Sequence, residues 1–331
     1  MVLVRTPYRI SLFGGGTDYP AWTRSHVGQV LSTTINKFCW LLVRRLPPYQ
    51  PYNFRVVYSK MEHVLKREDI QHPAVRACLE YVGVEDVAVI HDGDLPARSG
   101  MGSSSAFTVG LLHALHALKG QHVDRDRLAR EAIHVEQTML KEDVGAQDQV
   151  AVARGGFNRI TFMPHSSPLA QPVPVDPEVL DDLQSRLYLI YLGQRPEGVT
   201  ASDIGGAYDF EAKRPHLRTM TAMVDEAVDA LSRDDVDAIG PLLHDSWRLK
   251  RELGGVSDPE IDRTYEAARA VGATGGKLLG AGRGGFLLLY VPPSNRDFAD
   301  VVVAASAGRP ERMLVPFKFE REGSTLVHYA P

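Results

Sequence analysis

A loop of glycines and serines that runs directly into an apolar helix constrains this chain more than any other segment. Residues 96–106 read PARSGMGSSSA, and residues 107–118 read FTVGLLHALHAL, which is typical of a helix packed against a core. Gly100 and Gly102 can take a positive φ and expose backbone N–H groups, and the first helical turn adds unpaired donors and the positive end of its dipole. The hydroxyls of Ser103, Ser104 and Ser105 can cap the helix, bind phosphate oxygens or ligate magnesium. The segment predicts an anion site, and an ordinary loop with a serine cap is the alternative when it is taken alone.

Length and charge narrow the class of protein. A chain of 331 residues exceeds one average domain, so we expect two lobes or one large α/β unit. A content of 44% hydrophobic and 24% charged residues is typical of a globular protein with a sizeable core. The net charge of −4 gives no basis for expecting nucleic acid or an anionic membrane surface as a partner. Any phosphate site must therefore be local.

The cysteines and the N-terminus predict a cytoplasmic protein. Cys39 and Cys78 lie in apolar contexts, and one pair supplies neither a metal cluster nor a disulfide framework. We expect both to be buried, reduced thiols. The N-terminus lacks a basic-then-apolar signal, and the longest apolar run, residues 286–291, is far too short to cross a bilayer.

Patterning in the first half predicts a β-rich opening followed by helices. The run VLVRTPYRISLF suits a strand, broken or edged at Pro7 and closed by three glycines. Apolar steps of four, three and four predict a helix over residues 124–141, capped by Asp124 or Asp126. After Gly145 we expect a turn and then strands within residues 147–162. The other elements expected here are strands at 30–46, 54–59 and 84–92 and a helix at 69–82.

The second half reads as more helical. Five prolines in residues 163–181 make this segment the candidate lobe boundary, with lobes at residues 1–170 and 171–331. The apolar FLLLYV run after the glycine turn at 281–285 predicts a strand, as does the segment around Lys277 before it. We further expect helices at 216–232, 236–253, 259–271 and 298–307, and strands at 313–319 and 325–329.

Three glycine-rich segments, at residues 14–18, 100–106 and 280–285, suggest a nucleoside triphosphate site closed by loops from both halves. Each is weak alone, because turns need glycine for steric reasons. Other common motifs for nucleotide or metal binding do not match this sequence. Leu278 follows Gly276-Lys277 where a Walker loop needs Ser or Thr, and the third glycine of a dinucleotide fingerprint is missing after residue 16. Protein-kinase catalytic motifs are absent, and His134-Val135-Glu136 lacks the C-x-x-C of zinc deaminases.

These segments resemble those of the GHMP kinases, the superfamily of galactokinase, homoserine kinase and mevalonate kinase. PARSGMGSSSA is similar to the family's P-x-x-x-G-L-G-S-S-A-A phosphate loop, TPYRISLFGGGTDYP to its N-terminal sugar-kinase segment, and KLLGAGRGGFLLLY to its C-terminal G-x-G-x-G-G segment. The three matches stand in the family order and span nearly the whole chain. The resemblance implies an ATP-dependent phosphotransferase of α+β class, with an N-terminal β-rich α/β lobe and a C-terminal α+β lobe of ferredoxin-like form.

The resemblance also implies roles for individual residues. Asp148 would accept the proton of the attacking hydroxyl beside Arg9, whose permanent charge can depress the carboxyl pKa and stabilise developing negative charge. Ser104 and Glu136 would hold Mg²⁺, with Glu131 and Glu142 as rival carboxylates. The residues expected to bind ATP are Arg98, Gly100, Met101, Gly102, Ser103, Ser104 and Ser105.

The GGGTDYP segment bears on the acceptor. Within the family it most resembles that of bacterial kinases that phosphorylate C1 of D-glycero-D-manno-heptose 7-phosphate for nucleotide-heptose and surface polysaccharide synthesis. Asp18 can accept two vicinal hydroxyl hydrogens, and glycine lets the backbone approach a sugar ring. The residues expected at the sugar are Gly14, Gly15, Gly16, Thr17, Asp18, Gly282 and Arg283.

Other readings stay open at this point. The sugar phosphate needs cations, and the candidates are Arg98, Lys141, Arg154, Arg159, Arg195, Lys277 and Arg283. A 1-kinase of an unphosphorylated hexose, of fucokinase or galactokinase type, is the first alternative. A member of the family that binds sugar and ATP without catalysis is the second. The sequence leaves the oligomeric state open, a homodimer included.

Overall fold

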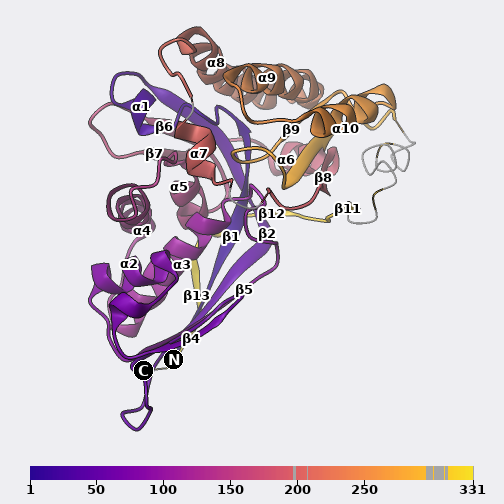
Figure 1. Cartoon of the computed structure of the whole chain (residues 1–331). Coiled ribbons are helices and arrows are strands. Elements are labelled where there is room, and N and C mark those ends of the chain that lie inside the picture. The colour runs from indigo at the N-terminus through magenta and orange to yellow at the C-terminus, as the bar shows by residue number, and fades with distance from the viewer. Residues whose placement is uncertain (197–198, 207, 296–300, 302–308, 310–311, 331) are drawn as a thin grey trace.

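The chain folds into two lobes, each built on its own sheet (Figure 1). The computed structural model describes residues 1–331 except 197–198, 207, 296–300, 302–308, 310–311 and 331. The first sheet has nine strands, with the path β13-β1-β2-β5-β3-β4 and with β6, β7 and β12 joined to it through β2. Its strands are β1 Val2–Phe13, β2 Gly28–Arg45, β3 Phe54–Val57, β4 Met61–Val64, β5 Val87–Gly93, β6 Phe157–Phe162, β7 Leu169–Pro172, β12 Phe319–Glu320 and β13 Thr325–Tyr329.

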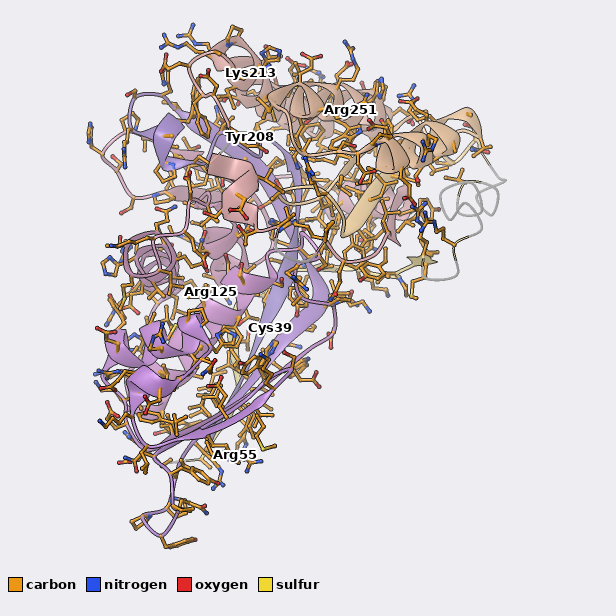
Figure 2. The ribbon with its side chains drawn as sticks, in the orientation of Figure 1. Cys39, Arg55, Arg125, Tyr208, Lys213 and Arg251 are labelled. Atoms are coloured by element: carbon orange, nitrogen blue, oxygen red, sulfur yellow. The ribbon has the colours of Figure 1, made fainter. Side chains whose placement is uncertain are left out.

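The antiparallel pair β1 and β2 forms the spine of the first lobe. Both strands are rich in β-branched and aromatic residues, which favour a pleated, buried surface. Of the two expectations for Pro7, a break or a strand edge, the break does not occur. β1 continues through it, and the pairing register shifts between Pro7 and Tyr8, an irregularity that accommodates a residue without an N–H. Cys39, on β2 (Figure 2), and Cys78 are both buried free thiols, as predicted.

Helices cover one face of this sheet, and the glycine-serine loop lies at the start of one of them (Figure 1). α3, Ser103–Leu118, packs against β1 and β2 and also contacts the neighbouring helices, which explains why it is apolar on every side. Its neighbours are α2 Pro73–Val82, α4 Arg125–Ile133 and α5 Gln147–Arg154, with the short turns α1 Pro20–Thr23 and η1 Arg67–Asp69 at the edges.

The second lobe has a four-stranded antiparallel sheet in the order β11-β8-β10-β9. In chain order this is 4-1-3-2, the order of a ferredoxin-like sheet, so the expected α+β class with a ferredoxin-like second lobe is confirmed. The helix expected at 298–307 falls almost entirely outside the described residues. The lobe comprises α6 Pro177–Ser185, β8 Leu187–Tyr191, α7 Ala201–Gly206, α8 Arg214–Ser232, η3 Val236–Ala238, α9 Ile239–Leu253, α10 Pro259–Ala270, β9 Gly275–Leu278, β10 Phe286–Tyr290 and β11 Met313–Leu314.

Two local expectations were right only in part, and both bear on the site. Residues 147–154 form helix α5, where a turn and a strand were expected, because their apolar side chains pack under α3 and α4; the strand expected after the paired glycines is present as β6. The helix expected over 124–141 ends as α4 at Ile133, and a π-helical turn, η2 His134–Met139, follows. Asp124 is the cap of α4, as predicted: its carboxylate accepts the N–H of Arg127 at 2.7 Å.

The end of the chain returns to the first lobe. β12 pairs with β2 and β13 with β1, so both termini lie at the same end of the molecule (Figure 1). The proposed division at residues 170 and 171 falls inside β7, a strand of the first sheet, and it stays a prediction. No helix in the described part of the chain is long and apolar enough to span a bilayer.

Candidate active site

The glycine-serine loop enters α3 with the backbone geometry that an anion site needs. Gly100 and Gly102 have φ values of 80° and 74°, and Gly102 is the N-cap residue of α3. No serine side chain caps the helix, so the serine-cap alternative is wrong. Ser103 and Ser104 instead line a cavity beside the first, unpaired N–H groups of the helix.

The third glycine-rich segment lies directly against this loop. A Cβ atom at Gly100 would lie 2.4 Å from the carbonyl oxygen of Leu279, and one at Gly280 would lie 2.4 Å from the Cα of Gly100. A Cβ at Gly285 would lie 2.1 Å from the carbonyl oxygen of Ser99. These contacts leave no room for a side chain, so glycines from both halves of the chain let the two backbones meet at the cavity.

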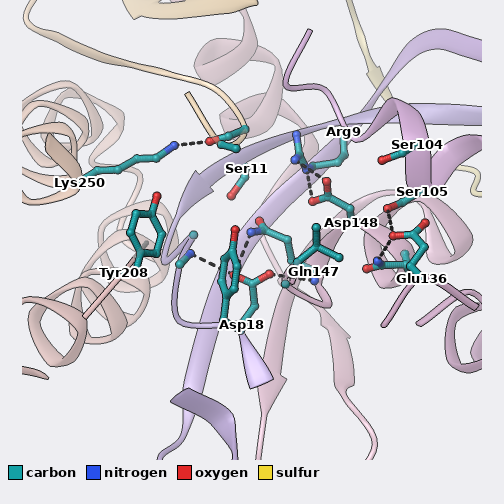
Figure 3. Close-up of a pocket in the computed structure, with 18 of the residues that line it drawn as sticks. Arg9, Ser11, Asp18, Ser104, Ser105, Glu136, Gln147, Asp148, Tyr208 and Lys250 are labelled. Carbon is teal, nitrogen blue, oxygen red and sulfur yellow. Dashed lines mark hydrogen bonds and ion pairs between the residues drawn. The ribbon is translucent and has the colours of Figure 1, made fainter. Parts of the chain in front are cut away.

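Arg9 and Asp148 form a buried, two-pronged ion pair at the base of the loop (Figure 3). Arg9 donates through Nε and Nη2 to the two carboxylate oxygens, each at 2.7 Å, and through Nη1 to the carbonyl oxygen of Gly100 at 2.8 Å. The Arg9 side chain is 3% exposed and that of Asp148 is 22% exposed. The arginine is therefore fixed, and the carboxylate still faces open space.

Asp18 lies in the same site but is already held by the protein. Its carboxylate accepts the backbone N–H of Gly16 at 3.0 Å and both the backbone N–H and the side-chain amide of Gln147, at 3.1 and 3.0 Å. Burial, and secondly the charge of Asp148, raise the pKa of Asp18 above its usual range. These bonds tie the first glycine-rich segment to the start of α5, the helix that carries Asp148.

Glu136 lies fully buried behind the loop, on the π-helical turn. Its Oε2 accepts the hydroxyl of Ser105 at 3.0 Å and the side-chain amide of Gln149, and its Oε1 has no partner in the described part of the chain. Burial, and secondly Glu142, raise the pKa of Glu136 to about 8. The π-turn changes the phase of the helix just where this carboxyl must point inward, a common use of such turns at functional sites.

Two cavities meet at the Arg9–Asp148 pair. The wall of the first includes Gly15, Gly16 and Asp18, and the wall of the second includes Arg98, Gly100, Gly102 and Ser103. The residues shared by both walls are Arg9, Ser104, Val144, Asp148, Gly280 and Ala281.

Several residues expected at the site lie outside both cavity walls. Thr17 is buried, and its hydroxyl oxygen lies 2.8 and 3.0 Å from the carbonyl oxygens of Gly14 and Gln29, either of which can accept its single O–H, so it shapes the loop. Gly14 packs against the backbone of Gln29. The remaining ones are Met101, whose carbonyl oxygen accepts the N–H of Arg9, Gly282, which packs against Val256, and Arg283, which is exposed and donates to the carbonyl oxygen of Gly255.

Comparison with known proteins supports the resemblance to the GHMP kinases. The GHMP kinases N terminal domain matches residues 65–156, and the GHMP kinases C terminal domain matches residues 227–302. The chain belongs to the GHMP kinases.

Relatives of this GHMP kinase act on sugars. It is 28% identical to the D-glycero-alpha-D-manno-heptose 7-phosphate kinase of Campylobacter jejuni, over 89% of this chain and 91% of that protein. It is 27% identical to the galactokinase of Pyrococcus furiosus, over 88% and 89% of the two chains. The crystal structure of a D-glycero-D-manno-heptose 1-phosphate kinase from Bacteriodes thetaiotaomicron superposes over the full length of both chains with a TM-score of 0.80 and 20% identity, which supports the fold.

Sequence reasoning missed several residues of the kinase site. Ser11, Gln147, Tyr208 and Lys250 all line the first cavity (Figure 3). For Lys250 a signal was present, because it falls on the buried face of α9. A lysine on the apolar stripe of a helix indicates either a buried partner or a ligand. The buried residues of that stripe are Leu243, Ser246, Trp247, Lys250 and Leu253.

The candidate cations divide between the two cavities. Arg98, Lys141 and Arg195 line the second, and Lys277 lines the first together with Lys250. The other three line neither cavity: Arg154 pairs with Asp126, Arg159 pairs with Asp225, and Arg283 donates to the carbonyl oxygen of Gly255.

Proposed function

We propose that this kinase transfers the γ-phosphoryl group of ATP to the anomeric hydroxyl of D-glycero-D-manno-heptose 7-phosphate, giving heptose 1,7-bisphosphate and ADP. The observation that carries the proposal is the Arg9–Asp148 pair at the junction of the two cavities, with the carboxylate open to both. The similarity to the Campylobacter heptose 7-phosphate kinase over most of both chains supports this acceptor over other sugars.

The second cavity suits the phosphates of ATP. The backbone of the glycine-serine loop and the first turn of α3 offer N–H donors, and Arg98, Lys141 and Arg195 supply positive charge around the opening. A triphosphate placed there would bring its γ-phosphoryl group toward the shared wall, where Asp148 and Ser104 lie.

The proposed phosphoryl transfer follows from the Arg9–Asp148 pair. The C1 oxygen of the sugar forms a bond to the γ-phosphorus, and the bond from that phosphorus to the β–γ bridging oxygen breaks, with its electron pair leaving on ADP. Asp148 accepts the hydroxyl proton. Arg9 fixes the carboxylate and places a permanent positive charge beside the reacting oxygens.

Magnesium fits the donor set. Glu136 Oε1 is a buried oxygen without a partner in the described chain, and Ser104 lies in both cavity walls. Mg²⁺ binds few protein oxygens, keeps waters and binds phosphate oxygens, so one carboxylate and one hydroxyl are sufficient. Bound there, the ion would neutralise phosphate charge. Glu136 contacts Ser105 through its other oxygen, which orients the free one.

Two alternatives remain in view. The galactokinase relative keeps a hexose 1-kinase as the second candidate, with fucose as a further acceptor to test. A binding protein without catalysis would have no use for a carboxylate held open beside an arginine at the junction of both cavities. That geometry favours an enzyme.

The deciding experiment measures ADP release with heptose 7-phosphate, heptose, galactose, fucose and mannose in parallel, with the product identified by ³¹P and ¹H NMR. We expect the highest kcat/KM for heptose 7-phosphate and a phosphate at C1 of the product. Turnover of galactose or fucose in the absence of turnover of heptose 7-phosphate would contradict the heptose assignment. The product would serve nucleotide-heptose synthesis.

A further inference from the structure

We propose that Lys250, assisted by Lys277 and Ser11, forms a subsite in the first cavity that binds a phosphate monoester carried by the acceptor. This inference rests on the proposed function, because it names the residues that recognise the phosphorylated end of the same acceptor. The subsite is built by the second lobe, through α9 and β9, against strand β1 of the first lobe.

Lys250 is a buried cation whose hydrogen-bond partners, among the described residues, are carbonyl groups. It is 6% exposed and lies in the wall of the first cavity. Its ammonium donates to the carbonyl oxygens of Leu278, at 3.2 Å, and Gly280. Within the described residues it makes no ion pair. An ammonium group has three N–H donors, so one remains for a ligand.

In the described part of the chain, no carboxylate near Lys250 is free to pair with it. Burial, followed by the positive charges of Arg9 and Arg195, lowers the pKa of Lys250 to about 7. Asp18 and Asp148 act in the opposite direction, but both are bonded to other groups, Asp18 to Gln147 and Asp148 to Arg9. An isolated buried cation is costly. A ligand that brings a dianion would remove that cost.

Lys277 and Ser11 add donors to the same wall. Lys277 is 2% exposed, and its ammonium donates to the carbonyl oxygen of Leu12 at 2.9 Å. Burial, with Lys250 and Arg9 nearby, holds the pKa of Lys277 well below its usual range. The hydroxyl of Ser11 is buried and has no partner in the described chain. Two lysines and a free hydroxyl in one wall form a donor set suited to phosphate oxygens.

The division of cations between the cavities argues for two anionic ligands. The arginines and lysine of the second cavity suffice for ATP, and Lys250 and Lys277 line only the first. The first cavity also holds Asp18 and Gly15–Gly16, the groups suited to sugar hydroxyls. In Figure 3, Lys250 enters from helix α9 and Tyr208 from the segment between α7 and α8, on the side opposite the Arg9–Asp148 pair. A neutral hexose would leave both lysines without an anion.

The test compares binding of D-glycero-D-manno-heptose and its 7-phosphate by calorimetry at pH 8, in two buffers of different ionisation enthalpy. For the wild type we expect the phosphate ester to bind more tightly, with net proton uptake because the dianion raises the pKa of Lys250. Lys250→Met should reduce the preference for the ester about 10- to 100-fold and remove most of the uptake. Lys60→Met, an exposed lysine in the turn between β3 and β4, is the charge-matched control and should change neither quantity.

Ser11→Ala provides a second variant that keeps the test valid if Lys250→Met folds poorly. Because the Ser11 hydroxyl makes no bond in the described chain, its loss should leave stability intact and reduce the preference about 3- to 10-fold. Equal weakening of ester and free sugar in both variants would assign these residues a structural role and overturn the inference. Turnover of heptose 7-phosphate with its preference intact in both variants would overturn the inference alone. Lys250-dependent binding of the ester without its turnover would support the subsite and contradict the proposed function.

Discussion

Arg9 and Lys250 are both buried cations in one site, and they are partnered in opposite ways. Arg9 makes two charge-assisted bonds to Asp148 and a third to a backbone carbonyl. Lys250, among the residues that the structure describes, is bonded to backbone carbonyl groups alone. The first arrangement is complete before any ligand arrives, whereas the second is completed by a ligand anion. A preorganised pair suits the chemical step, and an unpaired cation suits recognition.

The paired Arg9 and the unpaired Lys250 lie on different lobes. Arg9 and Asp148 lie on β1 and α5 of the first lobe, whose loop also supplies the anion site. Lys250 lies on α9 and contacts the backbone that joins β9 to the glycine turn of the second lobe. We infer that the first lobe carries the phosphoryl transfer and the second lobe contributes to the choice of acceptor.

The largest expected effect comes from removing the proton acceptor. Asp148→Asn keeps the shape of the side chain, and we expect kcat to fall by about 10² or more, the usual contribution of a general base. ATP binding should be largely retained, since the loop backbone is untouched. Steady-state kinetics and nucleotide titration measure the two quantities.

The stability of this variant must be measured in parallel. Asp148→Asn leaves Arg9 buried without its carboxylate, which lowers the free energy of unfolding. Urea unfolding shows whether the enzyme is folded under the assay conditions. A folded variant with nearly normal kcat would remove Asp148 from the catalytic role and with it one side of the comparison.

A smaller loss of kcat is expected when a side chain in the glycine-serine loop displaces the Arg9–Asp148 pair. A Cβ at Gly102 would lie 3.2 Å from Arg9 Cγ and 3.3 Å from Asp148 Oδ2, at a φ of +74°. Gly102→Ala should therefore displace the pair and lower kcat about 10-fold. Gly120→Ala is the matched control, because its φ is +70° and a Cβ there meets nothing within 4 Å. Equal activity of the two variants would show that the loop tolerates displacement.

The buried Lys250 should make the free energy of unfolding depend on pH. The pKa of Lys250 is about 7 in the folded state against 10.5 in the unfolded chain, so the unfolded state binds more protons between these values. The free energy of unfolding of the wild type should rise with pH across that interval, relative to Lys250→Met, and the difference should be constant below pH 7. Urea titrations of both proteins at pH 6.5, 8 and 9.5 give the slope. A difference independent of pH would show that Lys250 stays charged in the folded protein.

The sequence predicts the surroundings of the Arg9–Asp148 pair better than it predicts the position of Lys250. Arg9, Asp148, Glu136 and the glycine-serine loop lie in or near segments that resemble GHMP kinase motifs, and that resemblance implied their roles. Lys250 meets the first cavity only through the packing of α9 against β9, a contact between segments about 25 residues apart. Periodicity placed it on a helix but could not say what that face would contact.

The fold shows the same limit. Long strands and amphipathic helices such as α8, α9 and α10 were predicted close to their observed bounds, since each has a continuous pattern of its own. The short helix α5 was mistaken for strands, because eight residues with a small apolar face fit both periods. The π-turn at His134–Met139 has no distinct residue pattern, and neither has the return of β12 and β13 to the first sheet.

The smallest effect is expected at Arg283, although it lies in a glycine turn at the site. It has a φ of 58°, is exposed, and donates its Nε to the carbonyl oxygen of Gly255, outside both cavities. Arg195 is the contrasting cation: it is buried in the wall of the second cavity and donates to the carbonyl oxygen of Gly282. Arg283→Ala should change KM for ATP and for the sugar by less than about 2-fold, as is usual for exposed side chains, whereas Arg195→Met should raise KM for ATP. If instead Arg283→Ala raised KM for the sugar phosphate as strongly as Lys250→Met, the acceptor anion would be held from the glycine turn. The contrast between a paired and an unpaired buried cation would then no longer explain which residues choose the acceptor.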